Sequence, residues 1–327
     1  MLRLPPLQLL QPTSLDEALG LLAQHGASAR LIAGGTDLLP NLKLGPARPD
    51  WLISLQRVAG FDGVRVSADG GLEIGAGTRL QDVADDAEVR ARAPALASAA
   101  AVVASPQIRA MATLGGNLCV DTRCRYINQS ELFRDALGGC LKSHGSECHV
   151  VPGGQGCVAA LSSDTAPALI ALQGVAVVVG PAGERRVPIG ELYDTDGLAH
   201  VRLAAGEILW RVEVPMLAPG SAAVHRKWAV RKAIDFSLVS VAVRLDREPM
   251  GARALVGGVV AVAVLGPRPR VLDLRAYAGR SVDDALAREL GKLAFDRSKT
   301  LPNVPFDPVY RRERLAVEVR RAVLSLA

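Results

Sequence analysis

A chain of 327 residues, 49% of them hydrophobic, can form two or three domains with substantial cores, which argues against extensive disorder. The net charge of +5 comes from basic residues that occur in ones and twos, a pattern that argues against nucleic-acid binding. Pro5, Pro6 and Pro12 interrupt any signal sequence, and the longest apolar run, 254–266, is too short for a membrane helix. We therefore expect a cytoplasmic protein without a membrane segment. Its clustered cysteines would serve metal or redox chemistry rather than disulfides.

The first segment has the pattern of an α/β unit. Ser14 and Glu17 form a capping-box pattern that predicts the start of a helix, and Gly26 predicts its end. Two short apolar runs, 29–33 and 51–55, predict strands.

Predicted helices and strands continue through the rest of the chain. An alanine-rich composition after Pro94 predicts a helix over 95–104. An apolar stripe at helical spacing predicts a final helix over 311–326, with one face in a core formed by Leu315, Val319, Val323 and Leu326. The remaining patterns predict a helix at 166–172 and strands at 72–76, 175–179, 207–214, 238–245 and 254–265.

Two short glycine-containing loops carry the strongest local chemistry. One is Ala33-Gly34-Gly35-Thr36-Asp37, after a predicted strand, and the other is Thr113-Leu114-Gly115-Gly116-Asn117. Paired glycines allow close backbone approach and can leave several N–H groups pointing at one anion. A pyrophosphate held between both loops is the ligand that this pattern favours. Neither loop matches the Rossmann fingerprint or the P-loop.

These loops resemble those of the FAD-binding medium subunits of the molybdenum hydroxylase family, which includes xanthine dehydrogenase and carbon monoxide dehydrogenase. The resemblance covers almost the whole chain and depends on residues 31–38, 107–109 with 113–117, 163–169, 206–209 and 227–236. It implies an α+β fold with a PCMH-type FAD-binding domain of two α/β subdomains, 1–56 and 57–216. A C-terminal α+β domain, 217–327, would follow.

The resemblance also implies a set of FAD contacts. The pyrophosphate would lie against Leu31, Ile32, Ala33, Gly34, Gly35, Thr36, Asp37, Leu38, Thr113, Gly115, Gly116 and Asn117. Asp164 would bind a ribose or ribityl hydroxyl, and the isoalloxazine would lie near Ile208, Leu209 and Lys227. Thr78 is a further candidate, although it could equally be a residue that ends a strand. Apart from the resemblance, Ile208 and Leu209 are expected in a strand core, Lys227 at the surface and Asp164 at a helix N-terminus.

An insertion at about 120–160 separates Asn117 from Asp164, which lie much closer together in such subunits. It contains Cys124, Cys140, Cys148 and Cys157, which could bind a [4Fe-4S] cluster or a structural zinc. The spacing leaves both metals open, because it includes no pair of the zinc-knuckle type and no ferredoxin-type run. The position beside a flavin favours the cluster. Cys119 is expected to be a small buried side chain, and His144 and His149 are less favoured ligands than the four cysteines.

An insertion with an extra cluster resembles the beta subunit of 4-hydroxybenzoyl-CoA reductases. That resemblance implies electron transfer from reduced ferredoxin through [4Fe-4S] and FAD. The partners would be a small [2Fe-2S] subunit and a large molybdopterin-binding subunit, in a dimer of heterotrimers. The large subunit would remove the phenolic hydroxyl, since this chain shows no catalytic constellation of its own.

Three alternatives stay open at this point. The chain could serve an oxidising molybdenum hydroxylase that delivers electrons to NAD⁺ or another acceptor. It could be a zinc-stapled FAD-binding module without electron transfer, or a stand-alone reductase similar to the enolpyruvyl-sugar reductases.

Overall fold

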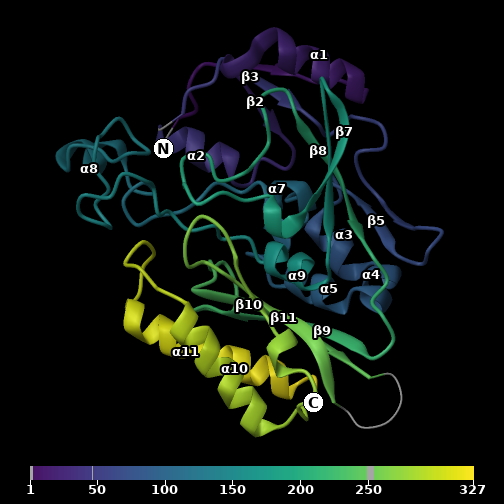
Figure 1. Cartoon of the computed structure of the whole chain (residues 1–327). Helices are drawn as coiled ribbons and strands as arrows, with labels where there is room; N and C mark the ends of the chain where they lie inside the picture. Colours follow the sequence, from purple (N-terminus) through teal and green to yellow (C-terminus); the bar gives the residue numbers. More distant parts are fainter. Residues whose placement is uncertain (1–2, 46, 249–253) are drawn as a thin grey trace.

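Three β-sheets follow one another along the chain in the computed structural model, which describes residues 3–45, 47–248 and 254–327 (Figure 1). The first sheet has three parallel strands in the order β1-β3-β2, namely β1 (Gln8–Leu10), β2 (Ala29–Ile32) and β3 (Trp51–Ser54). Helix α1 (Leu15–His25) packs against it, and α2 (Leu38–Leu44) follows the first glycine loop. Ser14 caps α1 as predicted, because its Oγ accepts a hydrogen bond from the Glu17 amide at 3.2 Å.

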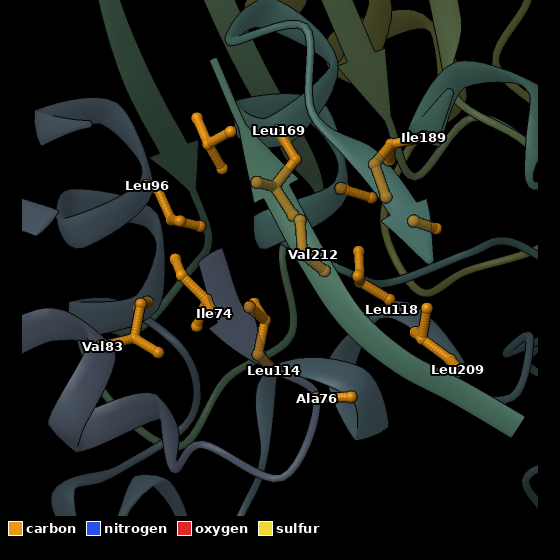
Figure 2. Close-up of a cluster of buried hydrophobic side chains, with 14 of the residues drawn as sticks. Ile74, Ala76, Val83, Leu96, Leu114, Leu118, Leu169, Ile189, Leu209 and Val212 are labelled. Atoms are coloured by element: carbon orange, nitrogen blue, oxygen red, sulfur yellow. The ribbon is translucent and has the colours of Figure 1, made fainter. Parts of the chain in front are cut away.

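The second sheet is antiparallel and has five strands in the order β4-β5-β8-β6-β7. Several helices, most of them short, pack against one another and against this sheet. Figure 2 shows the hydrophobic core between them, which includes Ile74, Leu96, Leu114 and Val212. The strands are β4 (Val64–Val66), β5 (Leu72–Gly75), β6 (Val175–Gly180), β7 (Gly183–Pro188) and β8 (Ile208–Val214). The helices are α3 (Leu80–Asp85), α4 (Ala87–Arg92), α5 (Pro94–Ala101), α6 (Pro106–Arg109), α7 (Leu114–Leu118) and α9 (Thr165–Ala171).

The third sheet is antiparallel with the order β12-β11-β10-β9. Two long helices lie along it at the bottom of Figure 1, and their apolar faces share a second core with the sheet. The strands are β9 (Ser221–Trp228), β10 (Val239–Arg247), β11 (Leu255–Ala263) and β12 (Arg270–Asp273), and the helices are α10 (Asp284–Arg297) and α11 (Pro308–Leu324). The predicted stripe on α11 is buried at Leu315, Val319 and Val323.

The cysteine insertion projects beside α2 at the left of Figure 1 and is closed at its base by a pair of backbone hydrogen bonds. The amide of Arg123 donates to the carbonyl of Ala160 at 2.8 Å, and the reverse bond is 2.7 Å long. Apart from α8 (Glu131–Ala136), the insertion is built from turns. The buried Arg134 holds these turns together by donating to Ser143 Oγ at 3.1 Å and to the carbonyls of Gln129 and Leu44, both at 2.5 Å.

The structure has the mixed helix-and-sheet architecture that the sequence predicts, although several elements differ from the prediction. Strand β9 was not predicted, because polar residues such as His225 and Lys227 interrupt its apolar pattern. The predicted helix over 95–104 ends at Ala101, and Ala104 has a positive φ of 44°. The second glycine loop is the start of helix α7. No helix in the described part of the chain is long and apolar enough to span a bilayer. The division at 56 and 216 stays a prediction.

Candidate functional site

The first glycine loop follows β2 and packs directly on the segment that precedes the second. A Cβ atom on Gly34 would lie 1.9 Å from the carbonyl oxygen of Met111 and 3.0 Å from Cα of Ala112, so only glycine fits there. Gly35 has a positive φ of 70°, which turns the chain towards α2. Over residues 3–45, 47–248 and 254–327, the amides of 34–37 donate no hydrogen bond to the protein. The loop therefore presents a run of free donors.

The second glycine segment, 113–117, is bonded differently. Thr113 Oγ1 accepts from the Gly116 amide at 3.1 Å, and the Gly115 amide donates to the Ala76 carbonyl at 2.8 Å. The amides of Leu114 and Asn117 are likewise used, on carbonyls of the protein. Any ligand contact here would therefore depend more on side chains than on backbone N–H groups.

Asn117 joins this segment to the chain beyond the insertion. Its Oδ1 accepts hydrogen bonds from Ser163 Oγ at 2.8 Å and from Thr165 Oγ1 at 2.7 Å. The Nδ2 group of Asn117 makes no hydrogen bond within the described residues, so it is a free donor beside the loop. The structure thus brings together the two framework segments that the insertion separates in sequence.

Asp164 and Lys227 form a buried ion pair with an Nζ–Oδ2 distance of 2.9 Å. Only 4% of the Asp164 side chain and 11% of the Lys227 side chain are exposed. Ser237 Oγ donates to the other carboxylate oxygen of Asp164, and Lys227 Nζ also donates to the carbonyls of Val102 at 2.9 Å and Asp235 at 3.1 Å. Lys227 is therefore not a solvated surface charge, and its position is fixed by three acceptors.

Three further predicted cofactor residues, Thr78, Ile208 and Leu209, are buried in protein contacts. Thr78 Oγ1 accepts from the Gly63 amide at 2.9 Å and donates to the Gly63 carbonyl at 3.1 Å. Ile208 and Leu209 lie in the core of the second sheet, where Figure 2 labels Leu209. Their contact with a flavin ring stays a prediction, as do the contacts inferred for the other residues of both glycine segments.

The four cysteines of the insertion line one cavity. Cys124, Cys140, Cys148 and Cys157 surround a small space that is partly open to solvent. His149 also lines it, and its ring lies 5.2 Å from that of Tyr126. Cys119 does not line it; it packs against the core of the second sheet, and burial raises its pKa to about 12. By its accessible surface Cys119 is only partly buried, whereas a fully buried side chain was predicted.

Burial raises the pKa of the Cys124 and Cys157 thiols, and the neighbouring cysteines raise it further. Backbone hydrogen bonds oppose this effect at both sulfurs, from Tyr126 and Ile127 at Cys124 and from Ala159 at Cys157. Such N–H groups stabilise a thiolate, which is the form that binds a metal. Among the described residues, no group of three or more His, Cys, Asp and Glu side chains is arranged to hold a metal ion.

Three polar residues that were not predicted connect the cavity with the first glycine loop. Arg123 binds Asp37 Oδ1 at 2.9 Å, and the Asp121 amide donates to Asp37 Oδ2 at 3.2 Å. Lys142 lines the cavity and binds Asp121 Oδ1 at 2.5 Å. Arg123 Nε is buried and has no hydrogen-bond partner in the part of the chain that the structure describes. A sequence signal existed only for Arg123 and Lys142, as basic residues close to cysteines.

Comparison with known proteins assigns the class. The family described as the FAD binding domain in molybdopterin dehydrogenase matches residues 5–217. The chain belongs to this family and is an FAD-binding subunit of the molybdenum hydroxylase type, so the sequence-based predictions of FAD and of the PCMH-type fold are confirmed.

Individual relatives match over most of their length. The aldehyde oxidoreductase FAD-binding subunit PaoB of Escherichia coli (strain K12) is 36% identical over 246 residues, which are 72% of this chain and 76% of that protein. The carbon monoxide dehydrogenase medium chain of Hydrogenophaga pseudoflava is 31% identical over 289 residues, 87% of this chain and 83% of that one. A solved carbon monoxide dehydrogenase from the same organism has the same fold, with a TM-score of 0.79, 24% identity and 99% of both chains covered.

Proposed function

We propose that this chain binds FAD beside its two glycine segments and an iron–sulfur cluster through its four inserted cysteines, and that it carries electrons between them. The observation that carries the proposal is that four thiols line one cavity in an insertion whose base is bonded to the first glycine loop. When bound, FAD exchanges electrons singly or in pairs, and a cluster exchanges them singly.

The pyrophosphate of FAD would lie on the first glycine loop. The four free amides of 34–37 can donate to its oxygens, and the absence of a Cβ at Gly34 lets the loop sit close to Met111. Two further unused donors, Arg123 Nε and Asn117 Nδ2, belong to segments bonded to this loop or its neighbour. These donors favour an anionic group at this place.

Four cysteine thiols line the cavity, which is the number of ligands that a [4Fe-4S] cluster or a structural zinc takes. We favour the cluster because the insertion is bonded to the proposed pyrophosphate loop, where a redox centre could exchange electrons with FAD and zinc could not. The backbone N–H groups at Cys124 and Cys157 would stabilise the thiolate ligands of the cluster.

Electron paramagnetic resonance of the dithionite-reduced, purified chain tests this assignment. We expect a cluster signal that wild-type protein shows and that Cys140→Ser loses. Cys119→Ser is the matched control, because Cys119 lies outside the cavity and its replacement should leave the signal unchanged. Zinc in the wild-type protein without a cluster signal would instead support a zinc-stapled FAD-binding module.

We further propose a complex with a large molybdopterin-binding subunit and a small [2Fe-2S] subunit, arranged as a dimer of heterotrimers in the cytoplasm. The names of the relatives, an aldehyde oxidoreductase and dehydrogenases, support the oxidising direction, with NAD⁺ or another acceptor taking electrons from this chain. The inserted cysteines are the reason to keep the second candidate, reduction of 4-hydroxybenzoyl-CoA with ferredoxin as donor.

Assays of the purified complex separate the two directions. An oxidising enzyme would reduce an acceptor dye with an aldehyde or aromatic heterocycle as electron source. A ferredoxin-dependent reductase would instead consume 4-hydroxybenzoyl-CoA with reduced ferredoxin or a low-potential dye. Purification of this chain as a lone active monomer would contradict both and favour a stand-alone reductase.

A further inference from the structure

A single lysine places a fixed positive charge at the wall of the cysteine cavity. Lys142 lies between Cys140 and Cys148 in the chain, and its side chain is only 12% exposed. Its ammonium donates to Asp121 Oδ1 at 2.5 Å, to Thr122 Oγ1 at 2.6 Å and to the carbonyls of Thr122 and Gly197, both at 3.2 Å. An ammonium has three N–H donors, so these acceptors saturate Lys142 and fix its position.

In the ion pair of Lys142 and Asp121, the lysine lines the cavity and the aspartate is more exposed to solvent. Lys142 lines the cavity together with the four cysteines, and its acceptors hold the ammonium in place. The carboxylate of Asp121 is 47% exposed, so water screens its negative charge more than it screens the buried ammonium. We therefore expect this pair to produce a net positive field in the cavity.

The acceptors of Lys142 also link the cavity to other parts of the fold. Thr122 Oγ1 donates to the Gly197 carbonyl at 2.8 Å, and the Gly197 amide donates to the Cys157 carbonyl at 2.8 Å. Asp121 is bonded through its amide to Asp37 of the first glycine loop. Hydrogen bonds thus connect Lys142 through Gly197 to Cys157, a predicted cluster ligand, and through Asp121 to Asp37 of the predicted pyrophosphate loop.

We propose that Lys142 is a positioning residue that sets the reduction potential of the metal centre in the cysteine cavity, an inference that rests on the proposed cluster. Reduction adds one electron, and hence one negative charge, to the centre without making or breaking a bond. A fixed cation nearby stabilises the reduced state more than the oxidised state and raises the midpoint potential.

A redox titration of the purified complex, followed by electron paramagnetic resonance, tests the inference. Lys142→Met removes the charge and keeps an unbranched side chain. It should lower the equilibrium constant for cluster reduction by on the order of tenfold, or about 59 mV for one electron. Lys142→Arg should stay close to wild type. Asp121→Asn should shift the potential upward, because it removes the opposing negative charge.

Lys292→Met is the matched control, because Lys292 is 75% exposed on α10 and should leave the potential unchanged. A Lys142→Met protein that keeps its iron and its wild-type potential would overturn the inference alone. If Lys142→Met loses its iron, the midpoint potential of Asp121→Asn provides the test. An unchanged or lowered potential in Asp121→Asn would then overturn the inference. Wild-type protein without iron would instead overturn the proposed function, and the inference with it.

Discussion

The fit of Gly34 against the segment before α7 gives a quantitative prediction for Gly34→Ala. The added methyl group would lie 1.9 Å from the Met111 carbonyl oxygen and 2.6 Å from its carbonyl carbon. Both atoms belong to the backbone, and the Met111 amide is itself bonded to the Ile108 carbonyl at 3.0 Å. The strain therefore cannot be relieved by rotating a side chain. It has to move one glycine segment away from the other.

Overpacking of this kind costs about 1–3 kcal/mol. At roughly 2–4 °C for each kcal/mol, the unfolding midpoint should fall by about 2–12 °C. We expect the FAD content per chain to fall as well, because the displaced loop carries the free amides of 34–37. Differential scanning calorimetry gives the first quantity, and flavin absorbance after acid release gives the second.

Gly20→Ala is the control with the opposite expected sign. Gly20 is an exposed residue inside α1, and a Cβ there would meet nothing within 4 Å. Alanine should stabilise the helix by up to about 1 kcal/mol and leave the FAD content unchanged. A Gly34→Ala protein with wild-type stability and wild-type FAD content would refute the close-packing argument for this loop.

Three further predictions concern the buried polar groups and the cysteines. Burial lowers the pKa of His225 to about 4, so the folded state resists protonation of this side chain. The free energy of unfolding should therefore fall by about 3 kcal/mol as the pH decreases from about 6.5 to about 4. Urea unfolding of wild type and His225→Asn across this range measures the effect, and the variant should show the weaker pH dependence. Asp164→Asn should lower the free energy of unfolding by about 3–5 kcal/mol, because it leaves Lys227 buried without its counter-charge. Adding Lys227→Met to the same chain should restore part of this stability in a double-mutant cycle. Additive losses of stability would contradict the pairing. Cys140→Ser should lose iron and keep most of its FAD, whereas Cys119→Ser should keep both; loss of FAD together with iron would make the insertion a structural clamp.

Much of the fold could be predicted because the relevant signals are local. The capping pattern at Ser14, the alanine-rich stretch after Pro94 and the stripe on α11 each specify their element without distant contacts. Strand β9 was missed because Lys227 and His225 face polar partners that only the folded chain supplies, namely Asp164 and Ser240. Tertiary contacts override local pattern in such a strand.

The candidate site was predictable in its residue types and less so in its bonding. The sequence indicated two glycine segments and a set of four cysteines apart from Cys119, and the structure places those four around one cavity. The sequence could not indicate that the amides of the second segment are bonded within the protein, because two of their acceptors, the carbonyls of Ala76 and Thr78, lie on another part of the chain. The roles of Asp121 and Lys142 likewise depend on contacts between distant residues.

We propose that the inserted cysteines hold an iron–sulfur cluster beside FAD. Iron, zinc, acid-labile sulfide and FAD should be determined together on the purified chain in its complex. We expect about four iron and about four sulfide for each FAD held by this chain, beyond those of any partner subunit, with no zinc. One zinc for each FAD, without iron or sulfide assignable to this chain, would contradict it.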